Sequence, residues 1–157
     1  MNKVTKFFLS VVGCELAGIA TTPITMAAIP VWYAHLEKPF FSPPNWVFGP
    51  VWTVLYFLMG VSLYFIWTSK GKDKEKQIAF TYFAIQLLLN ILWTPLFFGF
   101  QSPIFGLITI LLLVFFIIRT MQSFIKISPV AAWTLIPYLL WVSFATILNA
   151  SIVFLNS

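Results

Sequence analysis

Apolar residues run along this chain in four long blocks, and charged residues are almost confined to the short segments between them. Residues 7–29, 39–69, 77–118 and 127–157 contain one charged residue in total, Glu15. A transmembrane helix needs about 20 apolar residues, and the third block would form a helix of about 63 Å, twice the roughly 30 Å of a bilayer core. That block must therefore turn once, and its Gly and Pro residues indicate the turn at residues 99–103. The pattern predicts five spans, at about residues 7–28, 46–68, 78–99, 104–124 and 130–153.

A transmembrane β-barrel is the structural alternative to a helical bundle. Barrel strands alternate polar and apolar residues over about ten positions, whereas residues 107–116 are apolar almost throughout. We therefore expect an all-α integral membrane protein, a five-transmembrane-helix bundle that residues 1–157 form as a single domain.

The composition excludes a soluble domain and narrows the chemistry. Apolar residues make up 61% of the 157 residues and charged residues only 8%, against about 25% charged in soluble domains. The net charge of +5 comes from residues that punctuate apolar runs and form no basic stripe, so no nucleic-acid partner is expected. A single cysteine, Cys14, excludes an internal disulfide, and a single histidine, His35, leaves little scope for a metal site.

The distribution of Lys and Arg predicts the orientation of the chain in the membrane. Only Lys38 lies in a connection on one side, and eight basic residues belong to the other side: Lys3, Lys6, Lys70, Lys72, Lys74, Lys76, Arg119 and Lys126. The positive-inside rule then places the N-terminus in the cytoplasm and the C-terminus outside, in a plasma or inner membrane that the chain crosses several times. A signal peptide is the alternative for the first span, but Glu15 interrupts its apolar region.

The first external connection, residues 29–45, is unusual for a loop. It contains Pro30, Pro39, Pro43 and Pro44, which restrict the backbone, together with four aromatic residues that are too apolar to be left in water: Trp32, Tyr33, Phe40 and Phe41. We expect an ordered segment that folds back onto the end of the bundle. It is either an interfacial segment resting on lipid headgroups or a lid over a pocket.

The depth of the tryptophans separates two groups. Trp46, Trp67 and Trp133 lie near the ends of predicted spans, where tryptophan anchors a helix at the interface. Three others lie deeper and continue aromatic stripes at helical spacing: Trp52, Trp93 and Trp141. Such stripes are usually helix-packing core, but they would also suit the walls of a cavity for a flat hydrophobic ligand.

Polar residues inside the predicted spans need partners, because an unpaired polar group in a bilayer is costly. Asn90 and Asn149 are expected to bond across helices or to face a polar feature. Glu15, the only intramembrane acid, is expected near the cytoplasmic end of the first span, as a functional group, as an interfacial residue or in a hydrogen bond between helices. A stripe of small residues at Gly13, Ala17 and Thr21 suits close helix contact, within the bundle or across a dimer.

Four segments together resemble the TspO/MBR family, the tryptophan-rich sensory and translocator proteins that are also called peripheral-type benzodiazepine receptors. Residues 32–44 read WYAHLEKPFFSPP and residues 45–56 continue as NWVFGPVWTVLY. Residues 89–98 read LNILWTPLFF, and residues 137–149 read PYLLWVSFATILN. These segments are similar to the family's motifs in the same order and over essentially the whole chain.

The resemblance implies a five-helix bundle, often dimeric, that binds porphyrins such as protoporphyrin IX and haem-type tetrapyrroles, and other flat hydrophobic ligands, in a pocket under the first loop. Carried over to matching positions, the implied lining consists of Trp32, Tyr33, Pro43, Pro44, Phe48, Trp52, Asn90, Trp93, Trp141, Phe144, Ala145 and Leu148. The sterol motif of animal members, a Tyr followed by Lys or Arg, is missing from residues 152–157, so the resemblance does not extend to sterol recognition.

Three functions use such a pocket: a porphyrin-binding receptor or sensor, an enzyme that degrades porphyrin with light and oxygen, and a tetrapyrrole or lipid transporter. Receptor function is the leading hypothesis. No acid–base pair or nucleophile motif indicates conventional catalysis, so the catalytic residues of an enzyme would be unknown. The expected partners are a porphyrin or another hydrophobic small molecule, the lipid bilayer and a second copy of the chain. Neither a metal nor a covalently bound cofactor is expected.

Overall fold

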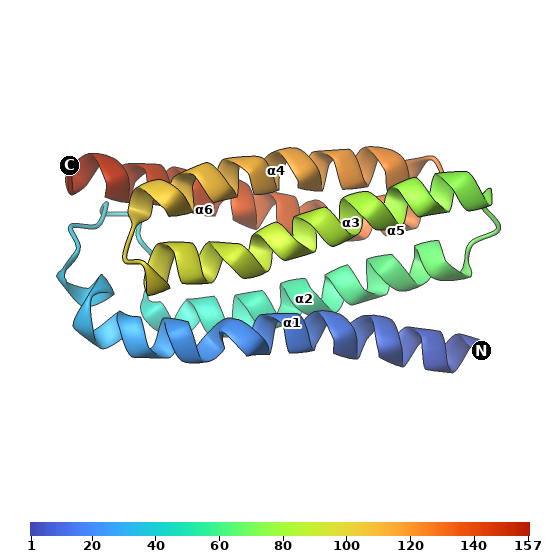
Figure 1. The fold of residues 1–157 in the computed structure, drawn as a ribbon, viewed down its shortest axis with the longest axis horizontal. Coiled ribbons are helices and arrows are strands. Elements are labelled where there is room, and N and C mark those ends of the chain that lie inside the picture. The colour runs from blue at the N-terminus through green and yellow to red at the C-terminus, as the bar shows by residue number, and fades with distance from the viewer.

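The computed structural model describes all 157 residues and contains helices but no strands. Five segments are long and apolar enough to cross a membrane, which confirms the predicted all-α five-helix bundle. The helices run up and down along one long axis, with the two termini at opposite ends (Figure 1). Their bounds are α1 Lys3–Val31, α2 Asn45–Thr68, α3 Asp73–Thr94, α4 Pro103–Ile125, α5 Pro129–Thr134 and α6 Ile136–Leu155.

The two ends of the bundle differ in charge. One end carries the connection between α1 and α2, residues 32–44, and is called the loop end here. The other end carries the N-terminus and the α2–α3 connection with its lysines, and is called the lysine end (Figure 1). The prediction of a cytoplasmic N-terminus depends on this unequal distribution of lysines between the two ends. The side of the membrane on which each end lies remains a prediction.

Three spans depart from the regular helices predicted by the pattern. Helix α1 begins four residues before the predicted span, where the Asn2 side chain accepts a hydrogen bond from the Thr5 N–H at 2.8 Å. The third span continues past α3 as a π-helix, Pro95–Gly99, in which Phe100 N–H donates to Pro95 O at 2.8 Å. The fifth span divides into α5 and α6 at Leu135.

Helices α1 and α2 pack closely at two glycines. A Cβ atom added to Gly60 of α2 would lie 2.5 Å from Val11 Cα of α1, and one added to Gly18 would overlap the Tyr56 ring. Gly13, which the small-residue stripe suggested for such a contact, has no atom within 4 Å of its Cβ position. The contact within the bundle therefore depends on Gly18 and Gly60, because helix periodicity identifies a face but not the neighbour that covers it.

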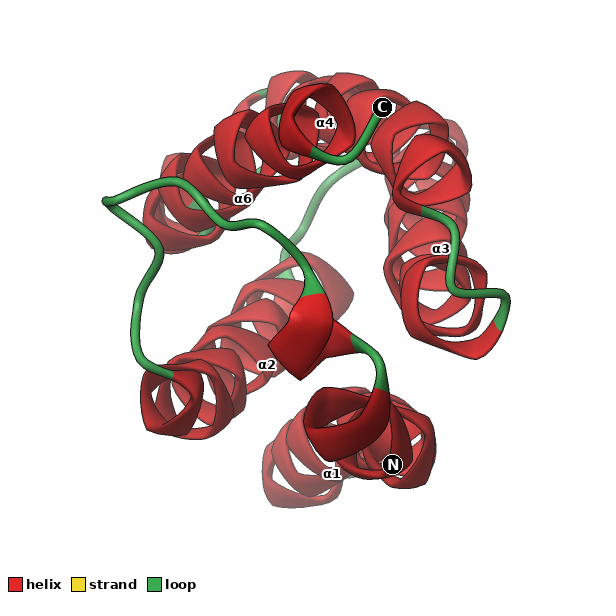
Figure 2. Cartoon of the chain, turned by 90° about the vertical axis from the view of Figure 1, so that its left-hand side faces the viewer, coloured by secondary structure: helices red, strands yellow, loops and turns green.

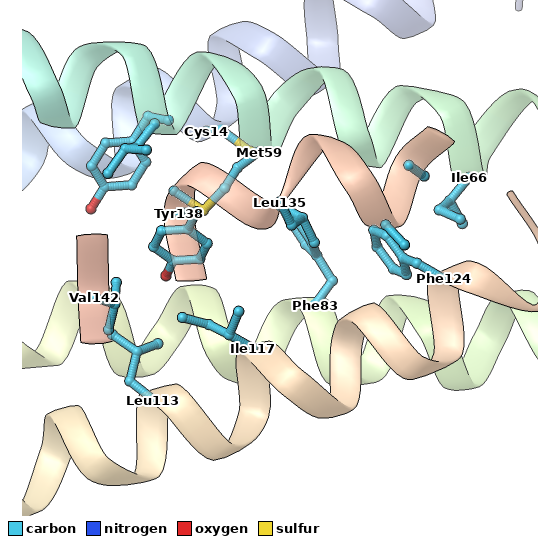
Figure 3. Packing of buried hydrophobic residues seen from close by; sticks show 14 of the residues in the cluster. Cys14, Met59, Ile66, Phe83, Leu113, Ile117, Phe124, Leu135, Tyr138 and Val142 are labelled. Atoms are coloured by element: carbon cyan, nitrogen blue, oxygen red, sulfur yellow. The ribbon is translucent and has the colours of Figure 1, made fainter. Parts of the chain in front are cut away.

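The packed core lies toward the lysine end and the middle of the bundle. Figure 3 shows Met59 of α2, Phe83 of α3, Ile117 and Phe124 of α4 and Tyr138 of α6 meeting there, all of them buried. A smaller buried cluster lies at the loop end and consists of Ala28, Tyr33, Phe97, Phe98, Leu148 and Ile152. Between these two clusters the side chains leave a cavity.

The α1–α2 connection is ordered and folds back over the bundle, as expected. Seen from the loop end, it crosses toward α6 before returning to α2 (Figure 2). Asn156 ties it to the end of α6: its side chain accepts from Glu37 N–H at 3.0 Å and donates to Glu37 O at 2.9 Å. Tyr33 is buried, whereas Phe40 is fully exposed on the protein surface. The segment thus combines a buried part with a residue available to the interface.

The α1–α2 contact gives a testable prediction. Gly60→Ala places a methyl group against the α1 backbone, which cannot move as a side chain would. We expect a loss of about 1–3 kcal/mol of stability, typical of overpacking, measured as a lower unfolding temperature in detergent. Gly13→Ala is the matched control, since its Cβ meets open space and alanine favours a helix by about 0.5–1 kcal/mol. Equal effects of the two substitutions would contradict the proposed contact.

Candidate functional site

A cavity of about 500 Å³ lies between the helices on the loop-end side of the core. Small-molecule sites in proteins have volumes of about 300–1,000 Å³ and are mostly apolar with a few polar groups. Residues from α1, α2, α3, α4 and α6 line it, together with Tyr33 of the connection and the π-helix that follows α3. The cavity is therefore formed by segments from most of the chain.

Eight of the twelve residues implied by the family resemblance line this cavity. They are Tyr33, Phe48, Trp52, Asn90, Trp93, Trp141, Ala145 and Leu148. The other four, Trp32, Pro43, Pro44 and Phe144, are not among the lining residues. Whether any of the twelve contacts a ligand remains a prediction.

Three of the four residues outside the lining support it from behind. The Trp32 ring packs edge-on against Phe97, with ring centres 5.4 Å apart. Phe144 lies against Trp141 at 5.5 Å. Pro44 is the N-cap residue of α2, so it sets where the helix that carries Phe48 and Trp52 begins. The resemblance identified the correct region of the chain but not which side chains face the cavity.

The aromatic walls come from pairs of rings four residues apart, one across the junction of α3 with the π-helix and one on α2. Trp93 and Phe97, four residues apart, stack with ring centres at 4.9 Å and planes inclined by 16°. On α2, the Trp52 and Tyr56 rings are 5.7 Å apart. Residues four apart lie on one face of a helix, so each pair presents a broad apolar surface to the cavity.

A chain of buried hydrogen bonds closes one side of the cavity and links three helices. Tyr56 OH donates to Asn90 Oδ1 at 2.9 Å, and Asn90 Nδ2 donates to Tyr138 OH at 2.6 Å. Tyr138 OH donates in turn to Gln86 Oε1 at 2.8 Å. This confirms that Asn90 bonds across helices. Sequence reasoning missed Gln86, although it lies four residues before Asn90 and hence on the same face of α3.

Asn149 also bonds across helices, as expected. Its Oδ1 accepts from the Trp93 indole N–H at 3.3 Å, and its Nδ2 donates to Pro103 O at 2.8 Å. The amide therefore holds the Trp93 ring in the wall and joins α6 to the first residue of α4. The Asn149 amide thus supplies hydrogen-bond partners to the Trp93 indole N–H and the Pro103 carbonyl, which no water molecule would reach inside a bilayer.

Helix α1 contributes a wall that sequence reasoning did not predict. Thr22, Thr25 and Met26 line the cavity from α1, and so does Glu15. Glu15 lies about 12 Å along α1 from Phe7, where the apolar run begins, and its expected place near the cytoplasmic end of the span remains a prediction. The α1 wall contains no aromatic residue. Its threonine and methionine positions therefore do not stand out from the other positions of the span in the sequence.

The cavity reaches the surface of the bundle between α1 and α2. Three of its lining residues are largely exposed there: Ile19 by 60%, Met26 by 65% and Trp46 by 75%. Trp46, expected to be an interfacial anchor, thus also borders the cavity. In a membrane this side of the bundle faces lipid, so the cavity communicates with the apolar part of the bilayer.

The electrostatics of the site are simple. Glu15 is its only acidic residue, and no Lys, Arg or His lines it. Burial raises the pKa of Tyr33 above the ordinary value, so its phenol stays neutral. His35 lies outside the lining, and its Nδ1 is 2.8 Å from Val31 O. The arrangement suits binding of a flat apolar molecule through ring contacts and a few hydrogen bonds.

Comparison with known proteins agrees with the motifs. The TspO/MBR family pattern matches residues 10–155. The chain is 43% identical over 143 residues to "Tryptophan-rich protein TspO" of Chlorobaculum tepidum, covering 91% of this chain and 90% of the relative. It is 42% identical over 154 residues to the protein of the same name from Archaeoglobus fulgidus, with 98% and 99% covered. It is 41% identical over 119 residues to human "Translocator protein", with 75% and 70% covered.

The buried hydrogen-bond chain gives a prediction about stability. Tyr138→Phe leaves Asn90 Nδ2 and Gln86 Oε1 without their shared partner. We expect a loss of about 1–3 kcal/mol, the cost of unpaired buried polar groups, measured by thermal unfolding in detergent. Tyr64→Phe is the control, because Tyr64 is only half-buried and lies outside this chain of bonds. A Tyr138→Phe protein as stable as the control would show that the chain of bonds contributes little.

Proposed function

Since the chain belongs to the TspO/MBR family, we propose that it is a membrane receptor that binds porphyrins and other flat hydrophobic molecules in the cavity between its helices. Family membership supports a multi-pass membrane protein with a receptor or transporter role. The finer statement, that the ligand is a tetrapyrrole, is the proposal.

The observation that carries the proposal is the shape and chemistry of the cavity. Trp52, Trp93 and Trp141 line one space of about 500 Å³. Aromatic rings interact favourably with other flat π-systems in stacked or edge-on arrangements. A conjugated macrocycle presents large flat faces to such walls, whereas a flexible lipid chain has no faces to stack.

An unpaired buried donor supports a polar contact in addition. The Trp141 indole N–H is buried and has no hydrogen-bond partner in the chain, although its ring lines the cavity. A buried donor without a partner costs about 1–3 kcal/mol. A ring nitrogen of a tetrapyrrole would relieve that cost if the Trp141 ring turned to expose its N–H to the cavity.

The absence of basic residues from the lining restricts how a tetrapyrrole with carboxylate side chains binds. Its acidic groups cannot be neutralised inside the cavity, where Glu15 is the only charged residue. They belong at the loop end, near Asn45 and Trp46, where the cavity approaches the surface. The macrocycle then lies deeper, between the aromatic walls.

The opening between α1 and α2 supports exchange of the ligand with the membrane. Porphyrins and similar molecules partition into bilayers, and an opening toward lipid lets them reach the walls without crossing water. The proposed setting is a plasma or inner membrane with the lysine end on the cytoplasmic side, since basic connections favour that side. A homodimer remains a prediction of the family resemblance.

Porphyrin binding is predicted to depend on the wall tryptophans. Trp52→Leu removes one aromatic contact, so protoporphyrin IX affinity should fall about 3- to 10-fold, measured by titration of the porphyrin's own absorbance band in detergent. Trp133→Leu is the control, because Trp133 is exposed and lies outside the lining. Binding that does not saturate, or that both variants weaken equally, would contradict the proposed site.

Access from the bilayer is predicted to depend on the opening between α1 and α2. Thr53→Phe adds bulk to a lining residue at this opening, so transfer of protoporphyrin IX from preloaded vesicles to the reconstituted protein should slow several-fold. Val54→Phe is the matched control, since Val54 is the next residue on α2, is exposed and does not line the cavity. Equal transfer rates in the two variants would place the route elsewhere.

A further inference from the structure

Glu15 is the feature that porphyrin binding leaves unexplained. It lies about 12 Å along α1 from Phe7, where the apolar run of a helix long enough to cross a bilayer core begins. A carboxyl group among the apolar residues of a membrane span is costly and is rarely kept without a partner.

The chain supplies no partner for this carboxyl group. No hydrogen bond or ion pair involves Glu15, and no basic residue lines the cavity. Its immediate neighbour Cys14 is buried in the core, and one turn further along α1 the Tyr56 ring packs on Gly18. The Tyr56 hydroxyl is already committed to Asn90.

The position of Glu15 in the cavity shows where a partner could come from. Among the lining residues of α1, it is the one closest to the lysine end, and the others follow toward the loop end as far as Ile29. Glu15 therefore marks the inner end of the cavity on the α1 side. A molecule that fills the cavity brings its innermost group toward this carboxyl.

We propose that Glu15 is a specificity-determining residue that accepts a hydrogen bond from the inner end of the ligand, selecting a protonated amine or a hydroxyl group there and rejecting a carboxylate. The inference rests on the proposed function, because it assumes that the cavity binds a flat hydrophobic body. A charge-assisted hydrogen bond is strong where water is excluded. A carboxylate at the same place would face a like charge without water or a cation to screen it.

This selection would also orient a tetrapyrrole. Its carboxylate side chains would be kept at the loop end by Glu15, in the orientation that the lack of basic residues already favours. Amine-bearing aromatic amphiphiles would bind the opposite way, with the charged group innermost. Glu15 would thus distinguish two ligand classes: tetrapyrroles, whose carboxylates stay at the loop end, and aromatic amines, whose charged group lies at the inner end of the cavity.

The test uses three pyrene probes that differ only in one substituent: aminomethyl, hydroxymethyl and carboxyl. Binding to the full-length protein in nonionic detergent is followed by energy transfer from tryptophan to pyrene, corrected for probe partition into empty micelles. We expect the wild-type protein to bind the aminomethyl probe at least about tenfold more tightly than the carboxyl probe. Hydroxymethyl pyrene should lie between them.

Glu15→Gln keeps the size of the side chain and an acceptor oxygen but removes the charge. The variant should lose most of the preference for amine over carboxylate while it still binds the hydroxymethyl probe. Glu37→Gln, which removes an exposed acid of the connection outside the lining, should keep the wild-type ratio. Because the ratio compares probes on one protein, a partial loss of folded protein does not change it.

The outcomes separate this inference from the proposed function. Equal amine-to-carboxyl ratios in wild type and Glu15→Gln, with hydroxymethyl pyrene bound in both, would overturn the role of Glu15 and leave the cavity as a hydrophobic site. A wild-type protein that shows no preference would do the same. Failure of all three probes to bind would overturn both.

Discussion

The hydrogen-bonded chain of Tyr56, Asn90, Tyr138 and Gln86 is the interaction on which the site depends. In a bilayer, helices gain little from burying apolar surface against one another, because lipid tails are equally apolar. Polar groups that find partners only on neighbouring helices therefore specify the arrangement. This chain joins α2, α3 and α6 at the boundary between the packed core and the cavity. Together with the bond between Asn149 and the Trp93 indole, it fixes the relative positions of the tryptophans on these helices.

Two features keep the cavity from closing. Near the middle of the bundle, two glycines let α1 and α2 approach closely. Gly18 of α1 contacts the Tyr56 ring, and Gly60 of α2 contacts the α1 backbone at Val11. Toward the loop end the facing residues are larger, and the space is bounded by rings such as Trp93 and Phe97 that stack on each other. Stacked rings are stiff, so they cannot collapse inward as leucine side chains would. The connection, which Asn156 ties to α6, contributes Tyr33 to the wall of this space.

Much of the fold and part of the site could be predicted from the sequence. The charge-free blocks predicted five spans because a bilayer imposes length and polarity on each helix. Aromatic stripes identified the walls on α2, α3 and α6, and the cost of unpaired amides predicted the bonds of Asn90 and Asn149 across helices. The α1 wall was missed, because threonine and methionine in a membrane span are equally typical of residues that pack between helices. That Phe144 packs behind Trp141 and does not line the cavity could not be predicted, because a resemblance to a family gives the place of a residue in the chain but not the direction of its side chain.

The distribution of polar groups argues for binding over conventional chemistry. The amides of Asn90 and Asn149 and the hydroxyl of Tyr138 are occupied by one another or by the backbone, so they hold the walls and are not free to transfer protons to a ligand. Polar groups without partners in the chain remain, among them the Trp141 indole N–H and the Glu15 carboxyl. The first is a donor on α6 and the second is an acceptor on α1. A site with apolar walls and few unpaired polar groups recognises a ligand by its shape and by the placement of its donors and acceptors, as the proposed receptor function requires.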